Sequence, residues 1–165
     1  MYKRQFLDYD FETIARNVAE LEPLEMRLEL KKAINNCHLI NDAYSSDLAS
    51  LEIALDFLEQ QPQHPKKALI LSDIQQSGLD TPELYQRVVN LVASKNLQYF
   101  VGIGSHIQSQ ASVFLKMEKI ACSFYADTGE FLKALPTHNF QNMTILLKGA
   151  RSFHFEDIAK RLEQK

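Results

Sequence analysis

Short apolar segments alternate with segments of helical periodicity through most of this 165-residue chain. Residues 68–71 and 99–101 are unbroken apolar runs, which are typical of strands covered on both faces of a sheet. Between such runs, residues 47–60 place their leucines three or four positions apart, which is the spacing of one helix face. Alternation of strands with helices indicates a mostly parallel sheet with right-handed crossovers. We therefore predict a three-layer, Rossmann-like α/β fold with about six strands and helices on both faces of the sheet.

The boundaries of the expected elements follow from apolar spacing, caps and turn residues. The first strand alternates polar and apolar side chains as an exposed strand does, and Asn35-Asn36 marks a turn into the second strand. The predicted strands are residues 26–30, 37–40, 68–71, 99–101, 120–125 and 144–147. The predicted helices are residues 10–20, 47–60, a helix that starts near residue 82, 107–115, 129–135 and 155–162.

Composition limits the classes of protein to which this chain can belong. Its net charge is −3 with both signs mixed, so it offers no basic face for nucleic acid and no polybasic membrane anchor. No apolar run approaches the roughly 18 residues of a membrane span, and the amino terminus lacks an apolar signal core. We therefore expect a cytoplasmic protein in which Cys37 and Cys122 are buried free thiols rather than a disulfide.

The common nucleotide and metal motifs are incomplete or missing. Gly102 and Gly104 look like the start of a dinucleotide loop, but the third glycine is absent, so a packing or turn role is favoured. No G-x-x-x-x-G-K-[ST] phosphate loop occurs. The five histidines show no ligand spacing with cysteines or carboxylates, so we predict no metal site.

Polar and glycine residues gather where the predicted strands end. Ligands of an open parallel sheet bind beyond the carboxyl ends of its strands, so these segments would form one binding rim. The segments are residues 41–47, 72–78, 102–106, 126–129 and 148–152. The alternative is that they are ordinary capped loops, which are polar in any fold of this class.

Two corners of this rim carry charge. Lys148 and Arg151 flank Gly149 after the last strand, and such a corner suits a carboxylate or a phosphate. The alternative is that both cations are solvated. Asp42 ends the second strand, where a carboxylate accepts hydroxyl hydrogens, as from a ribose. Its alternative role is to cap the helix that follows.

Four motifs occur in order along the chain and together resemble a known family. They are Met26-Arg27-Leu28-Glu29, Ile40-Asn41-Asp42-Ala43-Tyr44, Ile70-Leu71-Ser72-Asp73 with Gly78, and Leu146-Leu147-Lys148-Gly149-Ala150-Arg151-Ser152. Over residues 24–162 the chain resembles the C-terminal domain of Mur ligases. The resemblance implies that residues 1–23 are the tail of a central ATPase domain and that residues 24–165 are the Mur ligase C-terminal domain.

Within that family the motifs are most similar to the ligases that add D-alanyl-D-alanine to UDP-N-acetylmuramoyl-tripeptide in peptidoglycan synthesis, in the form fused to alanine racemase. The resemblance implies that ATP and Mg²⁺ are bound mainly by a central domain upstream, which with an N-terminal ligase domain would be a partner of this chain. It also implies that this fragment has no catalytic residue and is inactive alone. Pyridoxal phosphate is expected only if a racemase domain follows.

The resemblance assigns roles to nine residues of the rim and its approach. It implies nucleotide binding by Arg27, Asp42 and Tyr44. It implies substrate binding by Ser45, Ser46, Asp47, Lys148, Gly149 and Arg151.

The chain also departs from the family pattern. The loop after Tyr44 has Ser45-Ser46-Asp47-Leu48 where the family has Asn-Ala-Asn-Pro, Gln76 stands in place of a glutamate, and Tyr85 in place of a histidine. These changes bear on dipeptide specificity more than on the fold. The alternative function is a free-standing, flavodoxin-like α/β module that binds a small ligand or a partner.

Overall fold

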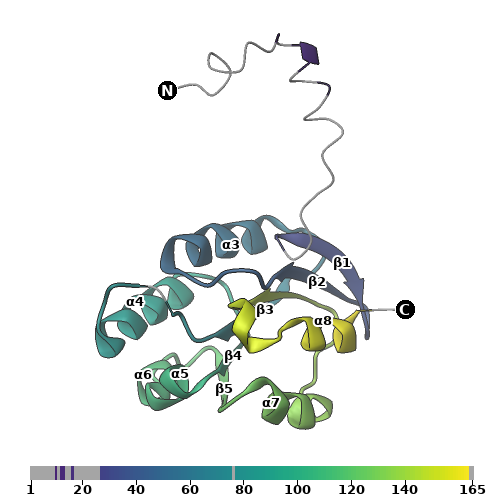
Figure 1. Ribbon diagram of the computed structural model, residues 1–165. Helices are drawn as coiled ribbons and strands as arrows, with labels where there is room; N and C mark the ends of the chain where they lie inside the picture. Colours follow the sequence, from purple (N-terminus) through teal and green to yellow (C-terminus); the bar gives the residue numbers. More distant parts are fainter. Residues whose placement is uncertain (1–9, 11, 14–15, 17–26, 76, 164–165) are drawn as a thin grey trace.

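The computed structural model describes residues 10, 12–13, 16, 27–75 and 77–163, and its strands form one six-stranded sheet (Figure 1). The strands are β1 (Glu29–Ala33), β2 (Cys37–Asp42), β3 (Lys66–Ser72), β4 (Tyr99–Ile103), β5 (Ala121–Tyr125) and β6 (Met143–Lys148). Their order in the sheet is β1-β2-β6-β3-β4-β5, in which β1 is antiparallel to β2 and the other neighbours are parallel. The predicted α/β fold class with a mostly parallel sheet is confirmed.

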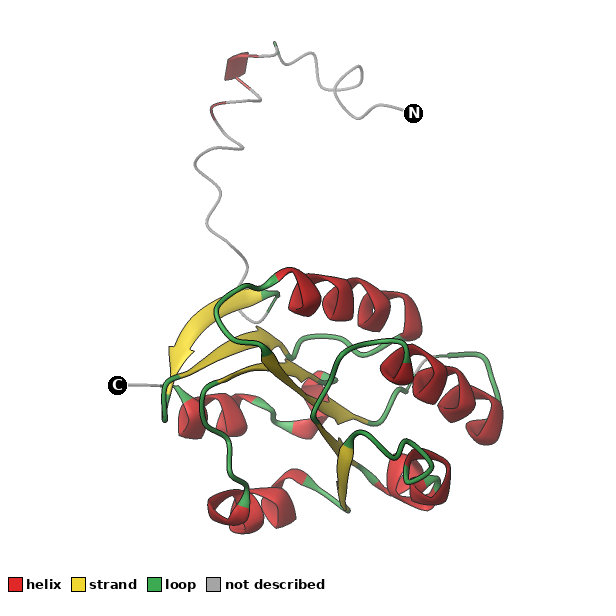
Figure 2. Ribbon diagram, turned by 180° about the vertical axis from the view of Figure 1, so that it is seen from behind, coloured by secondary structure: helices red, strands yellow, loops and turns green. Residues whose placement is uncertain are grey.

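Helices cover both faces of the sheet. They are α3 (Leu48–Gln60), α4 (Thr81–Ala93), α5 (Ser105–Ser109), α6 (Ala111–Phe114), α7 (Thr128–Ala134) and α8 (Glu156–Leu162), with the 3-10 turns η1 (Leu135–Thr137) and η2 (Arg151–Phe153). Helices α3 to α6 share a core with one face of the sheet, and α7 and α8 share a core with the other (Figures 1 and 2). The domain therefore has the three layers predicted from the sequence.

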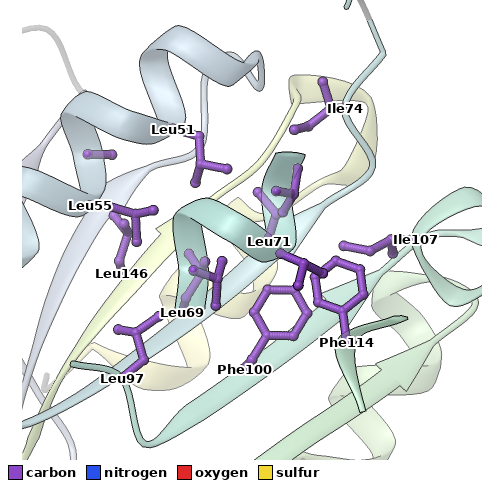
Figure 3. Close-up of a cluster of buried hydrophobic side chains, with 14 of the residues drawn as sticks. Leu51, Leu55, Leu69, Leu71, Ile74, Leu97, Phe100, Ile107, Phe114 and Leu146 are labelled. Carbon is purple, nitrogen blue, oxygen red and sulfur yellow. The ribbon is translucent and has the colours of Figure 1, made fainter. Parts of the chain in front are cut away.

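Neighbouring side chains of the central strands enter different cores. In β3, Leu69 contributes to the core under α3 and α4, whereas Ile70 contributes to the core under α8. Figure 3 shows the first of these cores, in which the ring of Phe100 stacks on that of Phe114 with centroids 4.7 Å apart. Burial on both faces explains why the strand sequences are apolar without alternation.

The long helices begin where the sequence supplies caps. The Asp47 carboxylate accepts a hydrogen bond of 2.9 Å from the backbone N–H of Ser50 and so caps α3. Asp80 caps α4 in the same way through Glu83, and Pro82 follows in the first turn. These carboxylates bind N–H groups that the first turn of a helix leaves without partners.

The first strand lies further along the chain than predicted. The expected strand at residues 26–30 begins at Glu29 and continues to Ala33. Antiparallel pairing with β2 holds these residues extended up to the hairpin turn, where Asn35 and Asn36 both have a φ of 54°. The turn at the two asparagines is confirmed, while apolar alternation alone misplaced the strand.

One predicted helix is divided in the structure. The helix expected at residues 107–115 is broken into α5 and α6 at Gln110, whose φ of −100° and ψ of 11° leave the helical range. The helix expected at residues 10–20 lies mostly outside the described residues. None of the helices in the described part of the chain is long and apolar enough to cross a membrane.

Both cysteines are free thiols, as predicted. Cys37 is buried in β2, and Cys122 is half-buried in β5. Burial raises the pKa of both thiols, that of Cys122 to about 11. A thiol with a raised pKa stays protonated at neutral pH and is a poor nucleophile.

Two partly buried histidines make the stability of this fold depend on pH. The ring of His138 stacks on Phe140 and its Nε2 lies 2.7 Å from the Tyr125 hydroxyl, while His64 Nε2 lies 3.0 Å from Nδ1 of His38. Burial lowers the pKa of both His64 and His138. The folded state therefore resists protonation of these rings more than the unfolded state does. Stability that is present at neutral pH is lost as the pH falls through the ordinary histidine value of 6.5.

Urea unfolding tests this expectation. The free energy of unfolding should be lower at about pH 5 than at about pH 7.5. His138→Gln keeps a hydrogen-bonding side chain that does not titrate, so this variant should show a weaker pH dependence. His154→Gln is the matched control, because the His154 side chain is 73% exposed. If His138→Gln kept the full pH dependence, the His138 ring would not be its source.

Candidate functional site

The carboxyl ends of the parallel strands meet at one edge of the sheet, as the sequence predicts. The segments that follow β3 and β4 enclose a hollow of about 450 Å³ at this edge, together with Phe153 of η2. Polar side chains that line it include Asp73, Gln75, Ser77 and His106. A concave, polar surface at the ends of parallel strands is the usual position of a ligand site in this class of fold.

Asp42 and Lys148 form a buried ion pair at this edge. They are cross-strand partners in β2 and β6, and Lys148 Nζ lies 2.7 Å from Asp42 Oδ2. Lys148 is only 1% exposed, and the Asp42 side chain is 11% exposed. The suggestion that Lys148 is a solvated side chain is therefore wrong. The structure joins two residues that the sequence had assigned to different ligands.

The alternative role of Asp42 as a helix cap is also wrong, because Asp47 caps α3. Both carboxylate oxygens of Asp47 accept hydrogen bonds from Ser50. These bonds and the nearby charge of Lys148 hold the pKa of Asp47 below its ordinary value. In the same loop Ser45 is exposed, whereas the hydroxyl of Ser46 is buried without a hydrogen-bond partner in the described part of the chain.

Arg27 and Tyr44 lie together at the exposed end of this corner. The Arg27 guanidinium carbon is 4.6 Å from the centroid of the Tyr44 ring, which is a cation–π contact. Both side chains are exposed, and Tyr44 is among the few large hydrophobic residues that the fold leaves on its surface. The contact brings together two of the residues predicted to bind nucleotide.

The remaining residues of the cationic corner differ from one another in burial. Gly149 is buried, and a Cβ atom there would lie 2.5 Å from Phe155, so this glycine serves the packing of η2 and α8 on β6. Arg151 is exposed at the start of η2, and within the described residues its guanidinium has no ion pair. The backbone N–H of Ala150 donates to the Ser72 hydroxyl at 2.9 Å, which ties this loop to the end of β3.

Sequence reasoning did not find the contacts of Asp73. Its carboxylate accepts hydrogen bonds from the Tyr85 hydroxyl at 2.9 Å, from the Ile107 N–H at 2.7 Å and from the His106 N–H at 3.1 Å. The imidazole Nδ1 of His106 also lies 3.1 Å from Asp73 Oδ2. The sequence offered one indication of these contacts, because Asp73 and Gly104-Ser105-His106 directly follow two successive strands.

The two glycines of β4 and its loop have the packing role that the sequence favoured. A Cβ atom at Gly102 would lie 2.8 Å from the Phe124 ring. One at Gly104 would overlap the Asp73 carboxyl group, and Gly104 has a φ of 134°. Among the described residues, no three histidine, cysteine or carboxylate side chains gather as metal ligands would.

Comparisons with known proteins agree with this fold. No family model matches the chain. It is 27% identical over 155 residues to the UDP-N-acetylmuramoyl-tripeptide–D-alanyl-D-alanine ligase of Bacillus subtilis strain 168, a match that covers 92% of this chain and 33% of the relative. The chain therefore spans about a third of the length of this relative.

Solved structures match over nearly the whole chain. Crystal structure II of MurF from Acinetobacter baumannii superposes with a TM-score of 0.74 at 23% identity, covering 94% of this chain and 34% of that one. The MurF ligase from Thermotoga maritima in complex with ADP superposes with a TM-score of 0.66 at 13% identity, covering 96% and 34%. The fold is the Rossmann-like α/β fold of a Mur ligase C-terminal domain. Over its length the chain is homologous to MurF, the ligase named above from Bacillus subtilis.

Proposed function

We propose that this chain is the C-terminal domain of an ATP-dependent amide ligase that joins D-alanyl-D-alanine to UDP-N-acetylmuramoyl-tripeptide in the cytoplasm. The observation that carries this proposal is the homology over 92% of the chain to a ligase whose name states these substrates. The polar carboxyl edge of the sheet supports it, because a domain of this kind would present that edge to the rest of the ligase.

The work of the ligase would be divided between domains. The chain has no phosphate loop, so an upstream central domain would hold most of ATP and the Mg²⁺. The exposed pair of Arg27 and Tyr44 suits a planar base and a phosphate, and Asp42 keeps its Oδ1 for a ribose hydroxyl while Oδ2 contacts Lys148. Residues 1–23 would be the tail of that central domain, and a pyridoxal-phosphate racemase domain after residue 165 stays a prediction.

In this proposal Arg151 binds the carboxylate end of the dipeptide. Arg151 is the exposed cation after β6, whereas the Lys148 ammonium is buried in an ion pair with Asp42. Arginine grips a carboxylate through two parallel hydrogen bonds, which a lysine does not reproduce. The neutralised pair of Asp42 and Lys148 would position the loop that carries Arg151 rather than bind the dipeptide itself.

Steady-state kinetics on a longer protein that includes an upstream phosphate-loop domain tests the function. This protein should consume ATP in proportion to D-alanyl-D-alanine joined to the tripeptide precursor, whereas the 165-residue chain alone should not. Arg151→Ala should raise the KM for the dipeptide by about 10–100-fold, and Arg151→Lys by less. Arg161→Ala, at an exposed position of α8, is the control. Absence of dipeptide ligation by the longer protein would contradict the proposal.

A further inference from the structure

The hollow at the carboxyl edge contains an imidazole held against a carboxylate. The His106 side chain is 69% exposed, whereas that of Asp73 is 5% exposed. Their contact joins Nδ1 of His106 to Oδ2 of Asp73 over 3.1 Å. Among the described side chains that line the hollow, only those of Asp73, Tyr85 and His106 are titratable. The acid–base chemistry of the hollow therefore belongs to these three groups.

The contacts of Asp73 fix the tautomer of His106. The Tyr85 hydroxyl and two backbone N–H groups donate to the Asp73 carboxylate, whose oxygens act as acceptors in each of these bonds. Burial raises the pKa of Tyr85, so this hydroxyl keeps its proton and remains a donor. A carboxylate oxygen opposite Nδ1 requires the imidazole proton to be on Nδ1. The other ring nitrogen, Nε2, then carries the lone pair of the imidazole, and His106 is among the residues that line the hollow.

Backbone hydrogen bonds tie the segments that carry Asp73 and His106 to the ends of neighbouring strands. The N–H of Gly104 donates to the carbonyl of Tyr125 at 2.9 Å, and the N–H of Asp73 donates to the carbonyl of Ile103 at 2.9 Å. The imidazole is therefore oriented before any ligand arrives, as the base in a proton transfer must be.

We propose that His106, oriented by Asp73, binds the ammonium group of the incoming dipeptide in this hollow and removes a proton from it. This inference rests on the proposed function, and it specifies where the amino group of the dipeptide binds during the ligation. The lone pair of His106 Nε2 can accept a hydrogen bond from an ammonium, and the negative charge of the buried Asp73 behind the imidazole adds to the attraction. Gln75, which lines the hollow, donates to the Ser152 hydroxyl at 3.0 Å, and Ser152 adjoins Arg151. The loop that carries Arg151 is thus tied to the wall of the hollow, and the proposal assigns the ammonium of the dipeptide to His106 and its carboxylate to Arg151.

The proton transfer balances as follows. An α-ammonium has a pKa of about 8, so the amine is mostly protonated at neutral pH and has no lone pair for attack. His106 Nε2 takes one proton and becomes an imidazolium paired with Asp73, and the amine nitrogen gains its lone pair. ATP converts the tripeptide carboxylate into an acyl phosphate with release of ADP, and the amine nitrogen then forms the C–N bond to the carbonyl carbon of that acyl phosphate. The C–O bond to phosphate breaks, and the departing phosphate takes the second amine proton.

Kinetics of the longer ligase tests the role of His106. His106→Gln should lower kcat by about 100-fold or more, because a glutamine amide does not accept a proton at neutral pH, while the KM for ATP stays unchanged. The activity of this variant should rise with pH up to about pH 8, where the free amine loses its proton without help. His154→Gln is the matched control, because His154 is also exposed and its Nδ1 lies 3.4 Å from Glu156. Ligation at the wild-type rate by His106→Gln would overturn the inference and leave the proposed function intact.

A binding measurement on the 165-residue chain tests the ammonium site at His106 separately from the proposed ligase function. D-alanyl-D-alanine at up to about 50 mM should shift the NMR resonances of the His106 imidazole but not those of His154. The N-acetylated dipeptide has no ammonium and should leave the His106 resonances unchanged. Equal shifts with both compounds, or no shift with either, would overturn the ammonium site whether or not the longer protein ligates the dipeptide.

Discussion

Replacing Asp42 by asparagine should destabilise the domain by about 3–5 kcal/mol, because the change leaves the Lys148 ammonium buried without its partner. Lys148 is 1% exposed and lies 2.7 Å from Asp42 at the end of β6. Water does not reach this ammonium, so leaving its charge unpaired would cost the folded state most of the desolvation free energy of the ammonium. Lys148→Met should cost less than Asp42→Asn, since the Asp42 side chain is 11% exposed and keeps some hydration.

Urea unfolding of the single variants and of a double variant without either charge measures the effect of this pair on stability. The double variant Asp42→Leu/Lys148→Met has no buried charge, so it should be more stable than Asp42→Asn. Lys160→Met is the control for a surface pair, because Lys160 is 72% exposed and lies 3.4 Å from Asp157, and it should change stability by less than about 0.5 kcal/mol. A loss below about 1 kcal/mol for Asp42→Asn would mean that the Lys148 charge finds water or another partner.

The fold could be predicted because its determinants are local in the sequence. The unbroken apolar residues of β3 reflect burial on both faces, and Asp47 and Asp80 stand at the positions where helices begin. Each of these signals needs only a few neighbouring residues. They define strands and helices, and alternation of the two then restricts the architecture to a mostly parallel sheet.

The contacts of the site could be predicted only in part, because they depend on the order of strands in the sheet. β6 is the last strand in the chain but lies between β2 and β3, which places Lys148 beside Asp42. Spacing along the chain does not reveal this insertion, so the two residues were assigned to different ligands, with a solvated lysine and a helix-capping aspartate as the alternatives. The same holds for His106 and Asp73, which meet only because β3 and β4 are neighbours.

Two of the predicted binding residues have structural roles that only the folded chain reveals. Asp47 was predicted to contact substrate, and its carboxylate oxygens are occupied by Ser50 in the cap of α3. Gly149 was predicted to bind substrate, and the ring of Phe155 fills the space beside it. Glycine also permits turns and close packing, and aspartate also caps helices. Only the three-dimensional surroundings distinguish these structural roles from ligand binding.

Gly104→Ala should destabilise the domain by about 3–5 kcal/mol. Gly104 has a φ of 134° and a ψ of 156°, a conformation that costs other residues about 1–3 kcal/mol. An added Cβ would also overlap the Asp73 carboxyl group, which hydrogen bonds from Tyr85 and Ile107 hold in place. Relief of this overlap requires that Asp73 give up buried hydrogen bonds, which adds to the loss.

Gly78→Ala separates the cost of the backbone conformation from the cost of the overlap with Asp73. Gly78 also has a positive φ, of 67°, but among the described residues no heavy atom beyond its two chain neighbours lies within 4 Å of the position that its Cβ would take. This variant should lose only the backbone contribution, about 1–2 kcal/mol. Urea unfolding of both variants measures the difference, and the NMR resonances of the His106 imidazole report whether Asp73 has moved. If Gly104→Ala lost no more stability than Gly78→Ala, the Asp73 carboxylate would be free to shift, and it would not hold His106 in a fixed orientation.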